Sequence, residues 1–360
     1  MKKYYIGVMS GTSLDGIDIV LCKINTTSCS LIHSFEYPFL HTLKEEILYV
    51  IHNKTSLQQI GELDHKLGLL YAKSIHQFLK YFHLQAKDII AIGLHGQTLW
   101  HAPESPFPFS MQLGDPNIVA AHTGIQTIAD FRRMDITNGG QGAPFSPAFH
   151  QFLFENLGEN VAVLNIGGMA NITLLDKQLQ GWDSGCGNVL LDSWIQKTQA
   201  KAYDKEGSFA KSGRINQTLL SALLQDKYFA KQAPKSTGRE YFNAAWLEKH
   251  LTHFEKLLDT DVQRTLLELT AKSIANDLNK TPTRKCIVCG GGAKNSFLMQ
   301  RLQTLSKAEI IISDSLGVSG DFLEAMAFAW FAYKRVHNEA VDLCSVTGAK
   351  KASLLGGIYG

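Results

Sequence analysis

The sequence has no long hydrophobic run and carries little net charge. No stretch reaches the roughly 18 apolar residues that a membrane-spanning helix needs. Gly, Ser, Thr and Asp interrupt the apolar residues that follow Lys2 and Lys3, which argues against the core of a secretory signal peptide. A net charge of +2 argues against a general nucleic-acid binder, which needs a basic face. We therefore expect a cytosolic protein with neither a nucleic-acid nor a membrane partner.

Cysteine is also scarce, because six cysteines in 360 residues are too few for a disulfide scaffold. Cys286 and Cys289 form a CxxC pair, a pattern found in zinc and redox sites. No second CxxC or histidine pair stands at metal-site spacing, however. The sequence Cys-Ile-Val-Cys before three glycines is typical of a buried strand that leads into a turn, so we favour a structural interpretation.

Two glycine-rich hairpin patterns, one in each half of the chain, are the most informative features present. Residues 4–24 contain an apolar strand, a tight turn of Gly, Ser and Thr ending in Asp-Gly, and a second apolar strand. A shorter version recurs at residues 162–176. Such turns leave backbone N–H groups free to face an anion, most often phosphate. Taken alone the first turn fits an ordinary hairpin equally well, but its repetition favours a duplicated fold with a nucleotide between its halves.

Predicted strands alternate with amphipathic helices, which favours an α/β fold, and the length favours two domains. The proline-rich residues 101–108 and the glycine-rich residues 138–147 are predicted as connections. The further predicted strands are 30–37, 89–94, 125–131 and 286–289, and the predicted helices are 44–51, 57–82, 117–122, 148–156, 189–200, 217–224, 261–279 and 320–338.

A series of sequence blocks along nearly the whole chain carries more information than any single turn. The blocks are GVMSGTSLDGID (7–18), IGLHGQTLWHAP (92–103), QLGDP (112–116), ADFRRMDITNGGQGAPFSPAFH (129–150), LNIGGMANIT (164–173), WDSGCGNVLLDSW (182–194), KSTGREYFN (235–243), CGGGAKN (289–295), GDFLEAMAFAWFA (320–332) and SVTGAKKASLLGGIYG (345–360). In sequence and order they resemble the anhydro-N-acetylmuramic acid kinases, sugar kinases of the actin-like ATPase superfamily. Residues 183–188 depart from the usual Asp-Thr-Gly-Pro-Gly-Asn but keep the Asp, both glycines and the Asn.

The resemblance implies two actin-like (ribonuclease H-like) domains with a nucleotide and sugar cleft between them. Residues 1–158 with 319–360 would form the first domain, and residues 159–318 the second. The implied activity is an ATP-dependent kinase that opens 1,6-anhydro-N-acetylmuramic acid with water and phosphorylates O6. That reaction belongs to cell-wall peptidoglycan recycling, and the resemblance also suggests a homodimer.

The resemblance assigns both glycine hairpins and the glycines after residue 289 to ATP, with Mg²⁺ held by Asp15 and Asp18 directly or through water. Backbone and hydroxyl donors of the first turn would meet the β- and γ-phosphates, and the last glycines would lie against the adenosine. The implied nucleotide-binding residues are Ser10, Gly11, Thr12, Ser13, Leu14, Asp15, Gly16, Ile17, Asp18, Gly167, Gly168, Asn171, Gly290, Gly291 and Gly292.

Two carboxylates are the predicted catalytic groups. Asp183 would activate the water that attacks the anomeric carbon, and Glu324 would face it across the sugar, since paired carboxylates commonly flank a cleaved acetal. Each has a structural alternative. Asp183 could be a helix N-cap, and Glu324 could be an acidic residue at a helix start that faces solvent or the helix dipole.

The remaining predicted sugar contacts are His95 and Gln97, which follow a buried strand, and Arg132, whose guanidinium suits the lactyl carboxylate. His95 and Gln97 could equally be structural groups, and Arg133 could serve in place of Arg132. The block at residues 235–240 has no assigned role.

Three alternative functions accompany the leading one. A simple sugar kinase would use a free hydroxyl instead of an anhydro bond. An ATP-gated binding or chaperone module, or a transcriptional regulator related to sugar kinases, would need an additional domain, such as a helix-turn-helix, for which this sequence leaves no room.

Overall fold

The structure, a computed structural model, describes residues 3–11, 14, 16–175, 179–233, 235–239, 241–254 and 257–360. The chain divides into two compact units. Unit 1 consists of Met1–Leu153 and Phe322–Gly360, and unit 2 consists of Phe154–Asp321. The division predicted from the sequence has its boundaries at residues 158 and 319.

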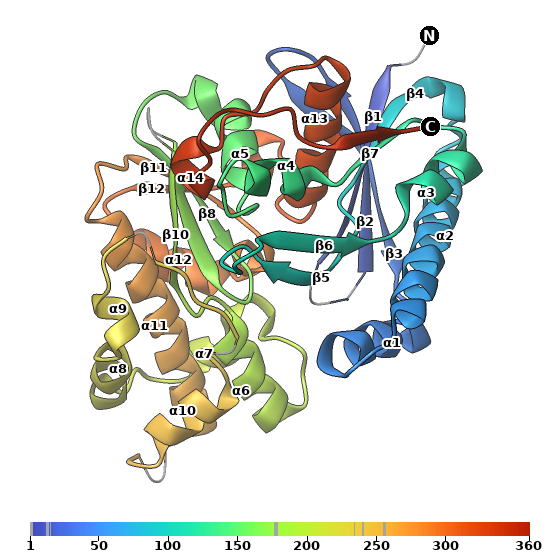
Figure 1. The fold of residues 1–360 in the computed structure, drawn as a ribbon. Coiled ribbons are helices and arrows are strands. Elements are labelled where there is room, and N and C mark those ends of the chain that lie inside the picture. The colour runs from blue at the N-terminus through green and yellow to red at the C-terminus, as the bar shows by residue number, and fades with distance from the viewer. Residues whose placement is uncertain are drawn as a thin grey trace. The chain divides into compact units, whose positions relative to one another are not determined.

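Unit 1 contains a six-stranded sheet, a two-stranded sheet and the helices packed around them (Figure 1). Its elements are β1 (Tyr4–Ser10), β2 (Gly16–Ile24), β3 (Cys29–Pro38), α1 (His41–His52), α2 (Leu57–Tyr81), β4 (Ile89–Leu94), β5 (Gln97–Ala102), β6 (Phe109–Leu113), α3 (Pro116–Thr123), β7 (Thr127–Ala129), α4 (Phe131–Thr137), α5 (Ser146–Phe154), α13 (Leu323–Val336), α14 (Cys344–Thr347) and β13 (Gly357–Tyr359).

The side chains of β1 show which helix covers each face of the main sheet of unit 1. Side chains in a strand point alternately to opposite faces. Ile6 and Val8 belong to the hydrophobic cluster that includes buried residues of α2. Between them, Gly7 faces α13 so closely that a Cβ there would lie 1.9 Å from the carbonyl oxygen of Ala325. The sheet is therefore covered by α2 on one face and α13 on the other.

Unit 2 contains a five-stranded sheet and the remaining helices. Its elements are β8 (Val161–Ile166), β9 (Ala170–Leu174), β10 (Gln180–Gly185), α6 (Val189–Gln199), α7 (Ser208–Ser212), α8 (Gln217–Leu224), α9 (Lys227–Ala230), α10 (Ala244–Leu251), α11 (Asp259–Leu278), β11 (Lys285–Cys289), α12 (Ser296–Leu305) and β12 (Glu309–Ile312).

The two main sheets share one topology. Unit 1 has the order β13-β7-β4-β1-β2-β3, and unit 2 has the order β10-β9-β8-β11-β12. In each, three successive antiparallel strands are followed by two strands that run parallel to the first of them. The repeated order confirms the predicted fold class, an α/β protein made of two domains of the same type.

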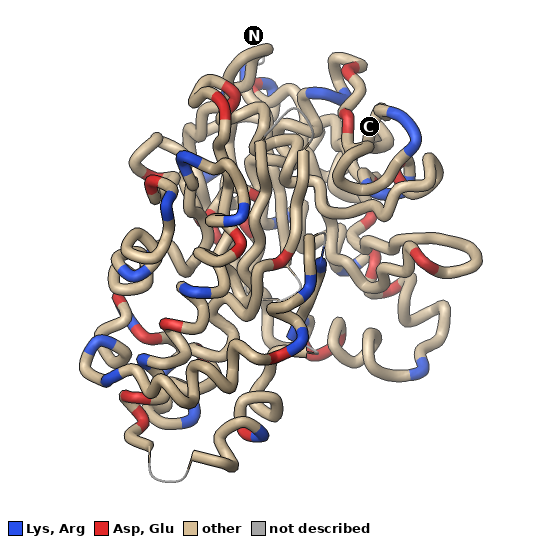
Figure 2. Tube along the Cα trace, turned by 90° about the vertical axis from the view of Figure 1, so that its left-hand side faces the viewer, with Lys and Arg blue, Asp and Glu red and all other residues tan. Residues whose placement is uncertain are grey.

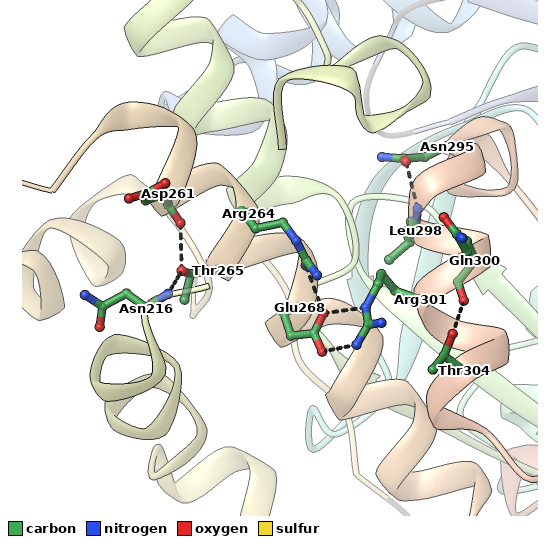
Figure 3. A network of polar contacts seen from close by, with 10 residues as sticks. All are labelled: Asn216, Asp261, Arg264, Thr265, Glu268, Asn295, Leu298, Gln300, Arg301 and Thr304. Atoms are coloured by element: carbon green, nitrogen blue, oxygen red, sulfur yellow. Dashed lines mark hydrogen bonds and ion pairs between the residues drawn. The ribbon is translucent and has the colours of Figure 1, made fainter. Parts of the chain in front are cut away.

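The long helix α11 is buried along most of its length, and its buried charged residues are paired. Glu268 lies between Arg264 of the same helix and Arg301 of α12 (Figure 3). Desolvation works to raise the pKa of Glu268, but the hydrogen bonds from Arg301 and Arg264 outweigh it and lower the pKa. This network joins α11 to α12 within unit 2.

Several local predictions are corrected by the structure. The strand predicted at residues 125–131 is shorter, because α4 begins at Phe131 directly after Asp130, which has a left-handed backbone with φ of 59°. The loop predicted at 101–108 begins two residues later, because β5 continues to Ala102. The hairpin β5–β6, the helices α4, α10 and α12, and the strands β12 and β13 were not predicted. All are short, so their sequences carry little periodicity of their own.

Charges of both signs are interspersed along the chain in each unit, as Figure 2 shows. This distribution agrees with the small net charge of +2. Within the described ranges, every helix is too short or too polar to cross a lipid bilayer.

Candidate active site

The first glycine turn connects β1 to β2 in unit 1. Thr12, Ser13 and Asp15, predicted to bind ATP or Mg²⁺, lie outside the described residues. Ser10 is buried, and its hydroxyl lies 2.7 Å from the hydroxyl of Tyr71 and 3.3 Å from the carbonyl oxygen of Gly96. A phosphate would have to compete with these partners for the Ser10 hydroxyl.

The apolar residues of this turn anchor it to the core. Leu14 and Ile17 are buried in the hydrophobic cluster of unit 1, so only their backbone could meet a nucleotide. Asp18 pairs with Met9 in the β1–β2 register. It therefore lies on the α13 side of the sheet, two residues from Val20, which pairs with Gly7.

The start of β5 approaches the same turn through Gln97. Its side-chain amide nitrogen donates to the carbonyl oxygen of Gly11 over 3.4 Å, and the residue is 1% exposed. Its Oε1 atom is buried and has no hydrogen-bond partner within the described part of the chain. Gln97 thus contacts the first turn and keeps an acceptor oxygen to which a ligand or a water molecule could donate a hydrogen bond.

His95, Arg132 and Glu324 form one charged cluster in unit 1. The Nη2 atom of Arg132 lies 3.0 Å from Nε2 of His95, and its Nη1 atom donates to the carbonyl oxygen of Gly142 over 3.2 Å. Burial, helped by the nearby Arg132 charge, lowers the pKa of His95 to about 3. The imidazole is therefore neutral at pH 7, and its Nε2 accepts the bond because a guanidinium can only donate.

The carboxyl of Glu324 completes this cluster from the first turn of α13. Desolvation raises its pKa, and the positive charge of Arg132 opposes the rise. Glu324 stands at the helix start and its side chain is exposed, as the alternative interpretation predicts, and its electrostatic partner is Arg132.

The structure distinguishes the two neighbouring arginines. Arg132 is half-buried beside His95, whereas the side chain of Arg133 is 62% exposed and forms an ion pair with Asp130 at 3.4 Å. Arg133 borders a polar pocket of about 170 Å³ that Asp64, Asp130 and His95 also line. Both arginines thus lie near His95, and Arg132 is the one whose guanidinium binds the imidazole directly.

In unit 2, the second glycine turn joins β8 to β9 and has open space above it. A Cβ added at Gly167 would meet only the carbonyl oxygen of Met169, at 3.8 Å. One added at Gly168 would meet the guanidinium of Arg239, at 3.4 Å. A phosphate could therefore approach this turn next to a positive charge.

The start of α6 is fastened to the same turn. The amides of Asn188 and Val189 donate to the carbonyl oxygens of Gly167 and Gly168, over 2.9 and 3.1 Å. Gly187 has φ of 44°, and a Cβ there would lie 2.5 Å from the Gly167 oxygen. Only glycine fits this contact without a shift of the backbone.

Asp183 lies within β10, directly opposite Asn171 of β9. Its Oδ2 atom accepts a hydrogen bond from the amide of Thr237 over 2.9 Å, and its own amide donates to the carbonyl oxygen of Lys235 over 2.9 Å. The interpretation of Asp183 as a helix N-cap is wrong, because the N-cap of α6 is Asn188. Asp183 instead stands inside a strand, since β10 continues to Gly185.

Cys186, at the position where the family usually has proline, is fully buried. Its sulfur lies 3.9 Å from the hydroxyl of Thr270, and burial raises the pKa of the thiol to about 12. Cys186 is therefore an uncharged core residue beneath the turn and does not act as a nucleophile.

Three glycines follow β11, and their surroundings differ. Cβ atoms added at Gly290 and Gly292 would lie 2.3 Å from side-chain atoms of Asn165 and Ile166 respectively. A Cβ at Gly291 would meet nothing within 4 Å. Close packing against β8 explains the outer two glycines, and only Gly291 has space for a ligand beside it.

The CxxC pair belongs to this strand. Cys286 and Cys289 are buried in β11, as the structural interpretation predicts. The described ranges, which omit Asp15, contain no cluster of three or more His, Cys, Asp or Glu side chains suited to a metal ion.

The sequence did not identify the residues around Asp183. Tyr228 donates its hydroxyl hydrogen to the Asp183 carbonyl oxygen over 2.7 Å, and Lys235 forms a buried ion pair with Asp277. The sequence offered one signal for Lys235 and Thr237, which is that both belong to a recognised sequence block. Their contacts with Asp183 depend on a loop some fifty residues away in the sequence, so no local pattern reveals them.

Comparison with known proteins adds the family. The family model described as Anhydro-N-acetylmuramic acid kinase matches residues 3–360. The anhydro-N-acetylmuramic acid kinase of Sulfurimonas denitrificans is 54% identical over 367 residues, covering 100% of both chains. The enzyme of that name from Pasteurella multocida is 51% identical over 363 residues, covering 99% of this chain and 96% of its own.

Solved structures give a weaker likeness. A ROK family glucokinase from Streptomyces griseus, in complex with glucose and AMPPNP, matches 92% of this chain and 99% of its own at 12% identity with a TM-score of 0.41. We draw no conclusion from a score of this size.

Proposed function

The chain belongs to the anhydro-N-acetylmuramic acid kinase family, and on that basis we propose that it phosphorylates 1,6-anhydro-N-acetylmuramic acid with ATP. The observation that carries the proposal is the family match across residues 3–360. The product would be N-acetylmuramic acid 6-phosphate, formed in peptidoglycan recycling.

The anhydro bond requires a step that ordinary sugar kinases lack, because O6 is locked in an internal acetal. Asp183 takes a proton from a water molecule, whose oxygen attacks the anomeric carbon. The bond from that carbon to O6 breaks, and the released O6 attacks the γ-phosphorus of ATP, with ADP as the leaving group. The hydrogen bond from Thr237 to the Asp183 carboxylate supports this role, because it orients the group.

Arg132, His95 and Glu324 would bind the sugar. The guanidinium of Arg132 suits the lactyl carboxylate, and neutral His95 suits a hydroxyl. The carboxyl of Glu324 could assist at the acetal oxygen, since paired carboxyl groups commonly flank a cleaved acetal.

The nucleotide would be held by the two glycine turns and by Gly291. Open space at Gly167 and Gly291 supports this assignment. Asp18 is the described residue that fits Mg²⁺, since this ion commonly takes one or two carboxylates and completes its shell with water and phosphate. The metal would neutralise charge on the phosphates.

Labelled water tests the hydrolytic step. The product made from ATP and the anhydro sugar in ¹⁸O-water should carry the label at the anomeric oxygen, as read by mass spectrometry. If the anhydro sugar is inert while N-acetylmuramic acid or another hexosamine is phosphorylated, the protein is a simple sugar kinase.

The variant Asp183→Asn tests the base. Removing a general base commonly costs about 10²–10⁴-fold in rate, so we expect a loss of that size in kcat while circular dichroism and ATP affinity are retained. Near-normal turnover would exclude Asp183 as the base. Analytical ultracentrifugation tests the homodimer that the family resemblance suggests.

A further inference from the structure

The segment of residues 235–239 contacts Asp183 at two points. The carbonyl oxygen of Lys235 accepts the backbone amide hydrogen of Asp183, and the amide of Thr237 donates to its carboxylate, each over 2.9 Å. These bonds hold both the backbone and the side chain of Asp183 to one short segment. That segment has no regular secondary structure, so something other than a helix or sheet must keep it in place.

A buried ion pair anchors the segment. The Nζ atom of Lys235 lies 3.0 Å from Oδ2 of Asp277, and their side chains are only 3% and 8% exposed. Asp277 stands near the end of α11, the most buried helix of unit 2. The side-chain amine of Lys280, which is 58% exposed, binds the other carboxylate oxygen of Asp277 at 3.2 Å.

The same carboxylate also holds the strand that carries Asp183. The indole nitrogen of Trp182 donates to Oδ2 of Asp277 over 3.1 Å, and Trp182 immediately precedes Asp183 in β10. Asp277 therefore ties β10 and the 235–239 segment to a common point. Tyr228 adds a third link, because its hydroxyl donates to the Asp183 carbonyl oxygen while its ring lies 5.2 Å from the Lys235 amine.

Stability alone is a weak reason for such a pair. Desolvation of two charges commonly offsets their attraction, and well-packed apolar residues often serve as well. Geometry is a stronger reason here, because the pair fixes the position of an amide that binds the predicted base. A misplacement of about 1 Å at a reacting group can lower a rate by about 10²-fold.

We propose that the Lys235–Asp277 ion pair is a positioning device that holds the amide of Thr237 against the carboxylate of Asp183. The inference rests on the proposed function, in which Asp183 is the base. It assigns a role to the sequence block at residues 235–243. Lys235 and Asp277 act through the segment and β10, and neither needs to touch the substrate.

Single and double variants separate positioning from stability. Lys235→Met and Asp277→Asn each leave a polar group without its buried partner, so both should lower stability as well as kcat. The double variant Lys235→Met/Asp277→Asn removes both charges and should regain much of the stability. If the pair positions Asp183, kcat of the double variant stays about 10–100-fold below the wild type, with the KM for ATP nearly unchanged.

The pH profile of kcat separates the two roles, because an ion pair that is only structural would leave this profile unchanged. A hydrogen bond to a carboxylate favours its ionised form. Loss of the Thr237 contact should therefore shift the acidic limb of kcat against pH to higher pH in the double variant. Tyr228 also interacts electrostatically with Asp183 and Asp277, and it is left unchanged in the double variant.

Glu268→Gln is the matched control, because Glu268 is an equally buried carboxylate of α11 with arginine partners. It should lower stability while leaving kcat and its pH profile as in the wild type. Trp182→Phe removes one bond to Asp277 and keeps an aromatic ring at this position, and it tests the proposal if the double variant does not fold. We expect a smaller loss of kcat and the same direction of pH shift.

Three outcomes are decisive. If kcat recovers together with stability in the double variant, the ion pair is only structural. The same conclusion follows if Glu268→Gln loses as much kcat as the double variant and shows the same shift of its pH profile. If Asp183→Asn remains active, the proposed base is wrong, whatever Lys235 does. If Asp183→Asn is inactive but the double variant has a normal kcat and pH profile, the positioning role is wrong while the proposed base stands.

Discussion

Single residues in this protein derive their chemistry from a few close neighbours. Asp183 is oriented by a backbone amide from a distant loop, and His95 is kept neutral by burial and by Arg132. The sequence predicted these residues as candidates because they stand in recognised blocks. It could not choose between Arg132 and Arg133, since that choice depends on which side of α4 faces His95.

Removal of the Arg132 charge should change the titration of His95 in a defined direction. Burial is the larger cause of its lowered pKa, and the charge of Arg132 is the smaller one. In Arg132→Met we therefore expect the pKa of His95 to rise from about 3 but to stay below the ordinary value of about 6.5. NMR titration of the imidazole signals would measure this shift, with His95→Gln to assign them. An unchanged pKa would show that Arg132 does not act on His95 electrostatically.

At the scale of elements, the close packing of helix α13 against the sheet of unit 1 sets the position of Glu324. Helix α13 packs against β1 and β4 at two glycines, and a Cβ at Gly93 would lie 2.0 Å from the carbonyl oxygen of Phe328. Glu324 lies one turn before Phe328 on this helix. Hydrophobic periodicity predicted α2, α8, α11 and α13 well because they are long or clearly amphipathic. It missed short elements such as α4 and β13, which depend on tertiary partners for their stability.

Gly93→Ala should displace α13 and so disturb Glu324. Overpacking of a core contact costs about 1–3 kcal/mol, and we expect a loss of stability of that size together with a fall in kcat. The control is Gly61→Ala in α2, where a Cβ would meet nothing within 4 Å. There the helix propensity of alanine should add about 0.5–1 kcal/mol of stability without affecting kcat. Denaturant unfolding and steady-state kinetics of both variants test the contrast.

At the scale of the whole molecule, two buried histidines link stability to pH. Burial lowers the pKa of His150 to about 4, and burial with Arg132 lowers that of His95 to about 3. An unfolded histidine titrates near 6.5. Between that pH and the folded values, the unfolded chain binds protons that the folded chain does not. This contribution therefore lowers stability as the pH falls below about 6.5, and it is absent above that pH.

His150→Leu isolates one of these contributions. Leucine binds no proton in either state, so the variant should lose less stability than the wild type when the pH changes from 7 to 5. A histidine with a pKa of about 4 in the folded state contributes about 2 kcal/mol to that change. Urea unfolding at the two pH values measures the difference. Equal losses in both proteins would mean that His150 is not held neutral by burial.

The sequence by itself determined the fold class, the duplicated hairpins, the family and most candidate residues. These properties follow from local patterns and from the order of sequence blocks, so they can be predicted without knowledge of tertiary contacts. Only the tertiary structure decided that Arg132 meets His95, that Asp183 lies in a strand and binds Thr237, and that Gly290 and Gly292 serve packing. The reason is physical: each of these results depends on distances between segments far apart in the chain, and such distances exist only once the core has packed.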